Sequence, residues 1–300
     1  MRPRDTALAL LVVVLWGVNF VVIKVGLRGV SPFVLGGLRL AFAAVPAVFF
    51  LKPPRVPLRL YAAFAFPTLL GQFALLFWAI QIGMPSGLSS VVQQSQAFFT
   101  VLLAAVFLRE RPTPAQLWGI ALAGVGLTLI GTESGRSFPF AGFALNLGAA
   151  AFWAVGNLAS RSLSRHGEVN VLAFVVWSSL LVPVPYFALA WAFQGRHAIT
   201  ASFQAMDAIS WAAVAYLAFG ATLGGYGLWN RLLKTYPAVQ VAPLALLVPV
   251  VGLLCGALAF GERLTAAQLA GSGLVAAGLA LPFAMARRLG VTVSGRPNRP

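Results

Sequence analysis

Long apolar runs separated by short polar breaks recur along the whole chain, and they limit it to folds that a lipid bilayer can surround. Sixty per cent of the 300 residues are apolar and 9% are charged, against roughly 45–50% and about 25% in soluble globular proteins. A helix that crosses the hydrocarbon core needs about 20 apolar residues. The chain is long enough for ten such helices, which predicts an all-α integral membrane protein.

Apolar runs bounded by charge, proline and glycine mark the ten expected membrane helices. Their approximate ranges are 6–27, 33–51, 60–81, 86–108, 114–131, 138–160, 169–193, 207–230, 237–260 and 266–286. The first run follows Arg2 and Arg4 as in a secretory signal, but it is long and lacks a small-residue cleavage site, so we expect a retained helix. Residues 287–300 show no periodicity and are expected to form a disordered cytoplasmic tail.

The basic residues separate by side when ten helices are assumed. Fifteen of the 21 Lys and Arg fall on the side of both termini, five on the other side, and Arg39 lies inside a helix. Positive charge in short loops stays cytoplasmic, so both termini are expected there. A net charge of +15 could instead indicate nucleic acid. The charges lie between apolar runs without an aromatic or zinc motif, so membrane topology is the preferred explanation.

The chain contains two copies of one unit. A shift of 152 residues aligns RERPTPAQLWGIALAGVGLTL (109–129) with GERLTAAQLAGSGLVAAGLAL (261–281) without a gap, and eleven of the twenty residues from 110 to 129 are identical. The same shift superposes Pro85 on Pro237. LWGVNF, which contains Trp16, is echoed by FWAVGN, which contains Trp153. We therefore predict a five-helix unit that occurs twice.

The two units are expected over residues 1–131 and 138–286. Because five is odd, the second unit enters the membrane from the opposite side, so a pseudo-two-fold axis in the membrane plane relates the two. Inverted repeats of this kind are typical of transporters that bind substrate near the midplane and work by alternating access. Channels and membrane enzymes can also contain repeats, so both remain alternatives.

The doubled motif also has a structural interpretation. Thr113 with Gln116, and Thr265 with Gln268, have the spacing of capping boxes at helix starts. Pro114 would occupy the first helical position, where its missing N–H costs nothing. The glycines that follow fit close helix packing; they are Gly119, Gly124, Gly126, Gly271, Gly273 and Gly278.

Three segments resemble the EamA family of the drug/metabolite transporter superfamily. They are WGVNFVVIK (16–24), SPFVLGGLRL (31–40) and the two (R/G)ERxTxAQLxG motifs. The resemblance covers nearly the whole chain and is strongest to the YddG-type bacterial amino-acid exporters. It implies ten helices in two inverted five-helix repeats around a central cavity, and a multi-pass protein of the bacterial inner (cytoplasmic) membrane that exports small metabolites.

Polar side chains at helical spacing mark the expected cavity wall, because such groups are costly when they face lipid. The predicted cavity residues are Trp16, Asn19, Ser89, Gln93, Gln96, Thr100, Trp153, Asn157, Tyr226, Trp229 and Asn230. Hydrogen bonds between helices, worth about 0.6–2 kcal/mol each, are the alternative explanation. The resemblance also places helix 237–260 beside the cavity, where the matched positions are apolar; they are Val241, Ala245, Val248 and Gly252.

Uncharged amides and hydroxyls among large aromatic rings suit a small zwitterion with an apolar side chain, which favours neutral amino acids. Dedicated phosphate sites favour clusters of Arg or Lys, and here only Lys24 and Arg39 lie in or near the membrane zone. Lys24 is a candidate contact for a substrate carboxylate, or it extends to the external surface. Arg39 needs a partner or a route to water, and the sequence identifies neither.

The acidic residues constrain the mechanism. All six fall at predicted helix ends or in loops, namely Asp5, Glu110, Glu133, Glu168, Asp207 and Glu262. Proton-coupled transporters commonly carry a titratable group within the membrane, as the resemblance implies for the related small multidrug exporters. We therefore expect facilitated export down the substrate gradient, with a proton-driven drug or metabolite antiporter as the alternative. Breaks at four residues are expected to act as gates or hinges: Gly83, Pro85, Pro237 and Pro243.

Enzyme and metal chemistry are not expected. An intramembrane hydrolase needs a nucleophile and a base within reach, but His166 and His197 lie in polar breaks and no GxSxG motif is present. A single cysteine, Cys255, excludes an intrachain disulfide and a cysteine-built metal site. We predict no cofactor and no nucleic-acid partner, only a small-molecule substrate and the bilayer. A monomer and a homo-oligomer both remain open.

Overall fold

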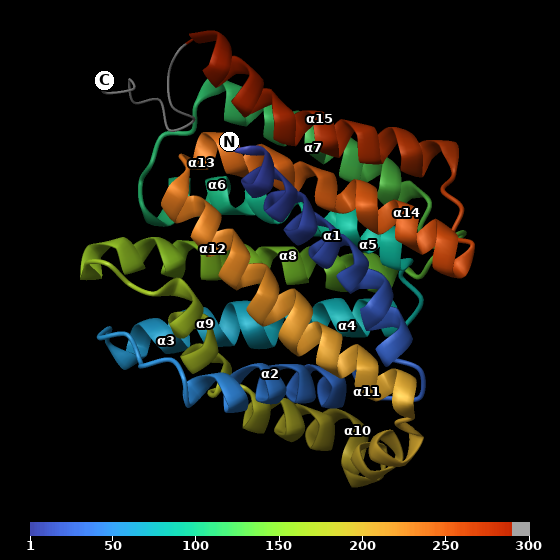
Figure 1. The fold of residues 1–300 in the computed structure, drawn as a ribbon. Coiled ribbons are helices and arrows are strands. Elements are labelled where there is room, and N and C mark those ends of the chain that lie inside the picture. The colour runs from blue at the N-terminus through green and yellow to red at the C-terminus, as the bar shows by residue number, and fades with distance from the viewer. Residues whose placement is uncertain (290–300) are drawn as a thin grey trace.

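A computed structural model describes residues 1–289, and these residues are almost entirely helical (Figure 1). The helices of the first half are α1 (Pro3–Gly26), α2 (Pro32–Val48), α3 (Leu58–Phe64), η1 (Ala65–Gln72), α4 (Phe73–Gln81), α5 (Ser86–Gln93), α6 (Gln96–Phe107) and α7 (Pro114–Thr132). Those of the second half are α8 (Phe140–Arg161), η2 (Ser162–His166), α9 (Val171–Ser179), α10 (Pro183–Ala205), α11 (Ala208–Ala215), η3 (Tyr216–Gly224), α12 (Gly225–Thr235), α13 (Ala238–Val241), η4 (Ala242–Leu247), α14 (Val248–Phe260) and α15 (Ala266–Leu289). Apart from one isolated bridge between Ser134 and Phe138, residues 1–289 contain no β-structure.

The helices have the length and composition of a multi-pass membrane protein. Within residues 1–289, nine helical segments are long and apolar enough to cross a membrane, and Pro32–Val48 is apolar but shorter, with 17 residues. Several of these segments join consecutive elements, such as α3, η1 and α4, into one continuous helix. The all-helical membrane class is therefore confirmed, while the number of ten crossings stays a prediction that depends on Pro32–Val48.

Side-chain caps define where two of the long helices begin. The backbone N–H of Thr113 donates to Gln116 Oε1 at 2.8 Å, and the N–H of Gln116 donates back to Thr113 Oγ1 at 3.3 Å. Thr265 and Gln268 exchange the same two bonds at 3.1 and 3.2 Å. Each pair satisfies N–H groups that the first helical turn leaves without partners. Both predicted capping boxes are confirmed.

Prolines interrupt two helices that the apolar pattern predicted as continuous. The predicted helix 169–193 is wrong as one piece: α9 ends at Ser179, and α10 begins at Pro183, which has no N–H to continue the ladder. α10 then runs beyond the predicted end, with a kink at Gly195, where φ is +80°. The predicted helix 237–260 is divided into α13, the 3-10 segment η4 and α14, with Pro243 and Pro249 in the first turns of η4 and α14.

The end of the chain differs from the predicted tail in its first residues. α15 continues to Leu289, so the expectation of disorder from residue 287 is wrong for residues 287–289. Residues 290–300 lie outside the described part of the chain.

Glycines allow α7 and α15 to pack backbone against backbone at one edge of the bundle (Figure 1). A Cβ placed on Gly119 would lie 2.5 Å from the carbonyl oxygen of Gly278, and one on Gly126 would lie 2.5 Å from that of Gly271. These four glycines therefore permit an approach that no larger residue allows. The prediction was wrong for the other two of the six, because Gly124 and Gly273 have no neighbour within 4 Å of an added Cβ.

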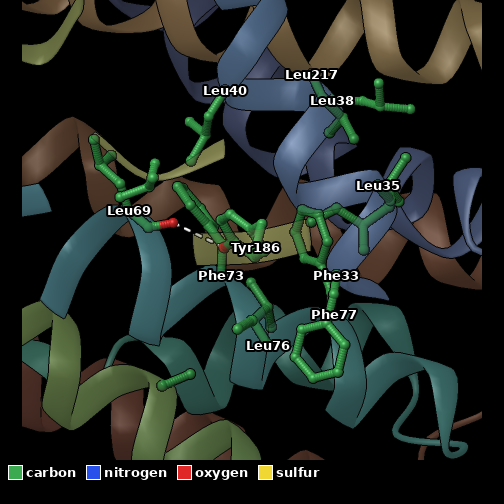
Figure 2. Packing of buried hydrophobic residues seen from close by; sticks show 14 of the residues in the cluster. Phe33, Leu35, Leu38, Leu40, Leu69, Phe73, Leu76, Phe77, Tyr186 and Leu217 are labelled. Carbon is green, nitrogen blue, oxygen red and sulfur yellow. Dashed lines mark hydrogen bonds between the residues drawn. The ribbon is translucent and has the colours of Figure 1, made fainter. Parts of the chain in front are cut away.

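Two π-helical segments, η1 and η3, lie midway along the continuous helices Leu58–Gln81 and Ala208–Thr235. Tyr186 of α10 is fully buried against η1, where its hydroxyl donates to the carbonyl oxygen of Leu69 at 2.8 Å (Figure 2) and to that of Leu70 at 3.1 Å. The wider turns of a π-helix disturb the usual backbone hydrogen bonds, so the Tyr186 hydroxyl helps to satisfy carbonyl oxygens of η1. π-bulges occur frequently at functional sites, which directs attention to the interior beside them.

Candidate functional site

Two adjoining cavities lie inside the helical bundle. The central cavity has a volume of about 290 Å³ and is lined by residues of α1, α2, η1, α4, α5, α6, α8, η3, α12, η4 and α14. A second cavity of about 370 Å³ is lined by the C-terminal half of α8, by Leu163 and Gly167 after it, and by the start of α9. Trp153 and Tyr226 line both cavities. The second cavity therefore adjoins the central one and extends toward the end of the bundle where α8 finishes, which we name the Arg161 end.

Three aromatic side chains form one wall of the central cavity. The rings of Trp16 and Trp229 lie 5.3 Å apart between centroids, and those of Trp16 and Tyr226 lie 5.9 Å apart in an edge-on arrangement. The indole N–H of Trp16 donates to the carbonyl oxygen of Ala221 in η3 at 3.1 Å. This wall offers an apolar and weakly negative ring surface to an occupant of the cavity.

A polar wall lies in the same cavity and has unused hydrogen-bonding capacity. Asn19, Gln72 and Gln93 are all buried, and each has an amide atom without a hydrogen-bond partner. These atoms are Asn19 Oδ1, Gln72 Oε1 and both Oε1 and Nε2 of Gln93. Buried polar groups are normally paired because an unmade bond costs about 1–3 kcal/mol. Their grouping around one cavity is what a site for a polar ligand requires.

Arg39 of α2 also lines the central cavity and is only 3% exposed. Its Nε donates to Thr222 Oγ1 at 3.2 Å, and its guanidinium carbon lies 4.0 Å from the ring centroid of Phe73. One terminal guanidinium nitrogen has no hydrogen-bond partner. The two ion pairs found within residues 1–289 do not include Arg39.

The other predicted residues of helices 86–108 and 138–160 are divided between the two cavities and their walls. Gln96 lines the central cavity and Asn157 lines the second one. Asn157 Nδ2 donates to Gln96 Oε1 at 2.7 Å and to Thr100 Oγ1 at 3.1 Å, so these three residues also form the hydrogen bonds between helices that were the alternative explanation. Thr100 and the fully buried Ser89 line neither cavity.

Of the remaining predicted site residues, some line the central cavity and others do not. Asn230 is half-buried and lines neither cavity. Of the four positions expected on an apolar wall, Ala245 and Val248 line the central cavity, whereas Val241 and Gly252 do not. The carboxylate that Lys24 contacts belongs to Glu262, and Lys24 lines neither cavity.

Lys24 and Glu262 form a compact polar cluster at the end of the bundle where α1 finishes, which we name the Lys24 end. Lys24 Nζ lies 2.7 Å from Glu262 Oε1, which also accepts from the N–H and the hydroxyl of Ser86, both at 2.9 Å. Glu262 Oε2 accepts from the N–H of Gly87 at 2.8 Å. Burial opposes the charge on Glu262, but these hydrogen bonds outweigh it, so the pKa of this carboxyl lies below its ordinary value.

The predicted gate residues lie at irregular points of the backbone. Gly83 has a φ of +113°, which glycine tolerates best, and Pro85 directly precedes α5. Pro237 directly precedes α13, and Pro243 lies in the first turn of η4. Whether these points move stays a prediction.

Two residues of the central cavity, Gln72 and Arg39, were not among the predicted cavity residues. The polarity of Gln72 within the apolar run LLGQFALLF (69–77) was the signal that could have identified it. Its contribution to the cavity depends on η1, and a π-helical turn leaves no periodicity that the apolar pattern could reveal. Within residues 1–289, no group of three or more His, Cys, Asp or Glu side chains that could hold a metal ion occurs.

Comparison with protein families gives one result that covers nearly the whole chain. The EamA-like transporter family matches twice, over residues 6–132 and 140–283. Among solved structures, one chain superposes with a TM-score of 0.64 at 20% sequence identity, covering 96% of this chain and 99% of that one. This likeness concerns the fold alone.

Relatives of similar length carry transporter names. A protein of Salmonella typhimurium strain LT2 named "Probable amino-acid metabolite efflux pump" is 46% identical over 282 residues, covering 93% of this chain and 94% of the relative. One with the same name in Escherichia coli K12 is 45% identical with the same coverage. A "Probable terminal-alkyne amino-acid exporter" of Streptantibioticus cattleyicolor is 27% identical, covering 90% of both chains. The double family match and these relatives place this membrane protein in the EamA-like transporter family.

Proposed function

We propose that this protein exports small neutral amino acids, aromatic or aliphatic, across the bacterial inner membrane by alternating access. The observation that carries the proposal is the central cavity, which unpaired buried amides and an aromatic wall line together. Amides can bind the ammonium and carboxylate of a zwitterion, and the rings can cover its side chain. The names of the relatives are consistent with this substrate class. We propose a transporter rather than an enzyme.

The proposed topology has ten crossings in two inverted repeats, 1–131 and 138–286, with both termini in the cytoplasm. The excess of Lys and Arg on the side of the termini supports this orientation. The Arg161 end then faces the cytoplasm and the Lys24 end faces outward. The second cavity reaches the cytoplasmic end in this arrangement, which is the direction from which an exporter takes its substrate.

We propose facilitated export without proton coupling. All six acids lie in a first helical turn, at a helix boundary or in a loop; they are Asp5, Glu110, Glu133, Glu168, Asp207 and Glu262. A proton-driven antiporter commonly uses a titratable group inside the membrane. In proteoliposomes, amino-acid uptake is therefore expected to be unaffected by an imposed proton gradient, beyond its effect on substrate charge. Uptake that rises with the gradient would favour the antiporter instead.

The test of the site compares two substitutions in α5. Gln93→Leu removes both unpaired amide atoms from the central cavity, so it should abolish transport of labelled phenylalanine and leucine without reducing membrane insertion. Ser89→Ala is the matched control, since Ser89 is buried one turn away and lines neither cavity. Equal transport by Gln93→Leu and the wild type would remove Gln93 from the site. Nucleosides and sugar phosphates should not be transported by either protein.

A further inference from the structure

Arg39 carries a buried positive charge that no ion pair within residues 1–289 neutralises. It is buried, it lines the central cavity, and its described partners are the uncharged Thr222 and Phe73. Removing a charge from water costs several kcal/mol or more unless an opposite charge and hydrogen bonds compensate for it. The ion pairs within residues 1–289 engage Lys24 and Arg161, not Arg39. A bound anion would supply the missing charge.

We propose that Arg39 binds the carboxylate of the transported amino acid in the central cavity. A guanidinium presents several N–H donors in a planar fork that matches a carboxylate, and one terminal nitrogen of Arg39 has no partner. This inference rests on the proposed function and makes it more specific. It assigns the anionic group of the substrate to α2, a helix on which the sequence analysis placed no cavity residue.

The rest of the cavity suits the cationic half of the same substrate. Asn19, Gln72 and Gln93 each have an oxygen without a donor, and an ammonium group offers three N–H donors. The rings of Trp16 and Trp229, which line the same cavity, attract a cation weakly and can pack against an apolar side chain. The cavity thus contains both a cationic donor and neutral acceptors, which together complement a zwitterion.

The charge on Arg39 also predicts which molecules are excluded. A primary amine without a carboxylate would place a second positive charge in the cavity and leave Arg39 uncompensated. We therefore expect decarboxylated amines and lipophilic cations to be poor substrates. Neutralising Arg39 should weaken this exclusion, because the repulsion disappears together with the carboxylate contact.

The experiment measures competition against labelled phenylalanine in proteoliposomes with phenylalanine, phenylalaninamide and phenylethylamine. For the wild-type protein, the amide and the amine should compete at least about tenfold more weakly than phenylalanine, because each lacks the charge-assisted hydrogen bonds. For Arg39→Gln, the preference should fall to about twofold or less. Arg136→Gln, which removes an exposed positive charge from the loop before α8, is the control and should keep the wild-type preference.

The outcomes separate this inference from the proposed function. If the wild-type protein transports neutral amino acids and the amine competes as well as phenylalanine, the role of Arg39 is wrong and the function stands. If it transports none of the amino acids, the proposed function fails. Comparison of the three competitors on the wild-type protein tests the inference even where Arg39→Gln does not fold.

A second inference comes from the two ion pairs, which the internal repeat relates to each other. The shift of 152 residues that superposes Pro85 on Pro237 also superposes Glu110 on Glu262. The shift of 137 that superposes Trp16 on Trp153 superposes Lys24 on Arg161. In the structure, Lys24 pairs with Glu262 at 2.7 Å and Arg161 pairs with Glu110 at 3.0 Å. Each base therefore pairs with the acid of the other repeat.

The two pairs lie at opposite ends of the bundle and differ in their surroundings. α1, which ends near Lys24, and α8, which ends at Arg161, run in opposite directions across Figure 1. The side chain of Glu262 is 12% exposed and that of Lys24 is 33% exposed, whereas those of Glu110 and Arg161 are 55% and 46% exposed. Glu262 also binds the first N–H groups of α5 and so joins α1, α5 and the α14–α15 connection.

We infer that these pairs are alternating latches. The Lys24–Glu262 pair, with the N-terminus of α5, holds the Lys24 end closed in this structure, while the second cavity reaches the Arg161 end. When the bundle opens at the Lys24 end, the Arg161–Glu110 pair becomes the buried one. By the same shift of 152 residues, Glu110 would then face the N-terminus of α13, which follows Pro237. Both are cross-repeat contacts, so each breaks only when the repeats move relative to one another.

The test uses Ala245→Cys as a reporter in a Cys255→Ser background, because Ala245 lines the central cavity. A membrane-impermeant maleimide is applied to intact cells. It reaches the protein from the external face of the membrane, where the Lys24 end is proposed to lie. Glu262→Gln should increase the labelling rate by about tenfold, because it weakens several charge-assisted bonds of the closed state. Glu110→Gln, the same change at the repeat-related position, should not increase it. Equal rates for the parent and Glu262→Gln, or an increase with Glu110→Gln alone, would refute the latch.

Discussion

At the scale of single residues, the central cavity depends on polar side chains whose bonds are left unmade. Asn19, Gln72 and Gln93 each keep an unpaired amide atom, and Arg39 keeps an unpaired nitrogen. The cost of such atoms is normally avoided in a folded protein. Their grouping at one cavity indicates that stability is traded for binding, as expected where a ligand completes the hydrogen bonds.

Acid should weaken the closure at the Lys24 end. The pKa of Glu262 lies below its ordinary value of 4.5 because Lys24, Ser86 and Gly87 donate to its charged form. This stabilisation is fully present above pH 4.5 and is lost as the pH falls through the lowered pKa. The neighbouring basic residues are Arg28, whose guanidinium carbon lies 5.9 Å from the ring centroid of Phe260, and Arg263, which directly follows Glu262. Maleimide labelling of Ala245→Cys should therefore accelerate below pH 4.5, after correction for thiol reactivity, and a Glu262→Gln background should remove this dependence. An unchanged pH profile in that background would contradict the role of Glu262.

The sequence predicted which polar residues lie inside the bundle better than which of them line the cavity. Polar residues at helical spacing identified Asn19, Gln93 and Gln96 as cavity candidates, because polarity inside a membrane span needs a reason. The same pattern included Ser89 and Thr100, which lie on buried faces turned toward other helices. Which face of a helix meets water and which meets a neighbour depends on packing between distant segments, and spacing alone does not encode it.

At the scale of helices, the irregular segments occupy corresponding places in the two repeats. The shift of 152 residues places η1 on residues 217–224, within η3. It also places the break between α5 and α6, at residues 94–95, on the last two residues of η4. Helix starts were predictable because caps are local, as at Thr113 and Thr265. The π segments were not, since their widened turns depend on contacts from elsewhere.

Tyr186→Phe should destabilise the protein through η1. The hydroxyl of Tyr186 donates to the carbonyl oxygen of Leu69 (Figure 2) and shares its proton with that of Leu70, and removing the hydroxyl leaves these acceptors short of a donor. The free energy of unfolding should fall by about 1 kcal/mol. Thermal unfolding of the purified protein in detergent measures the change. Tyr61→Phe is the control, because the hydroxyl of Tyr61, a residue of α3, donates to the loop carbonyl of Pro54 instead. Equal losses would mean that η1 has no special dependence on Tyr186.

Glycine substitutions test the contact between α7 and α15. Gly126→Ala should lower the free energy of unfolding by about 1–3 kcal/mol, because the added Cβ would lie 2.5 Å from the carbonyl oxygen of Gly271 and force the helices apart. Gly124→Ala, two residues away, meets no atom within 4 Å and should be neutral or slightly stabilising. Melting temperatures in detergent compare the two. If both variants melt alike, the close approach does not contribute to stability.

At the scale of the whole molecule, the sequence repeats, but the two ends of the helical bundle differ in how deeply their ion pairs are buried. Repeat, charge distribution and apolar runs were readable from the chain because each is a property of sequence position. The difference between the ends was not, because both repeats carry a glutamate and a basic residue at matched positions and only the folded structure buries one pair more than the other. The cavity is therefore asymmetric although the sequence repeat is nearly symmetric, as expected for one of two alternating states.

Counterflow is the measurement that tests the transport mechanism most directly. Liposomes containing the purified protein are loaded with unlabelled phenylalanine and diluted into a trace of labelled phenylalanine. A carrier that alternates between two closed ends predicts a transient accumulation of label above its equilibrium level, saturable by external phenylalanine and absent with Gln93→Leu. A monotonic rise to equilibrium that does not saturate would identify an open channel and contradict the account.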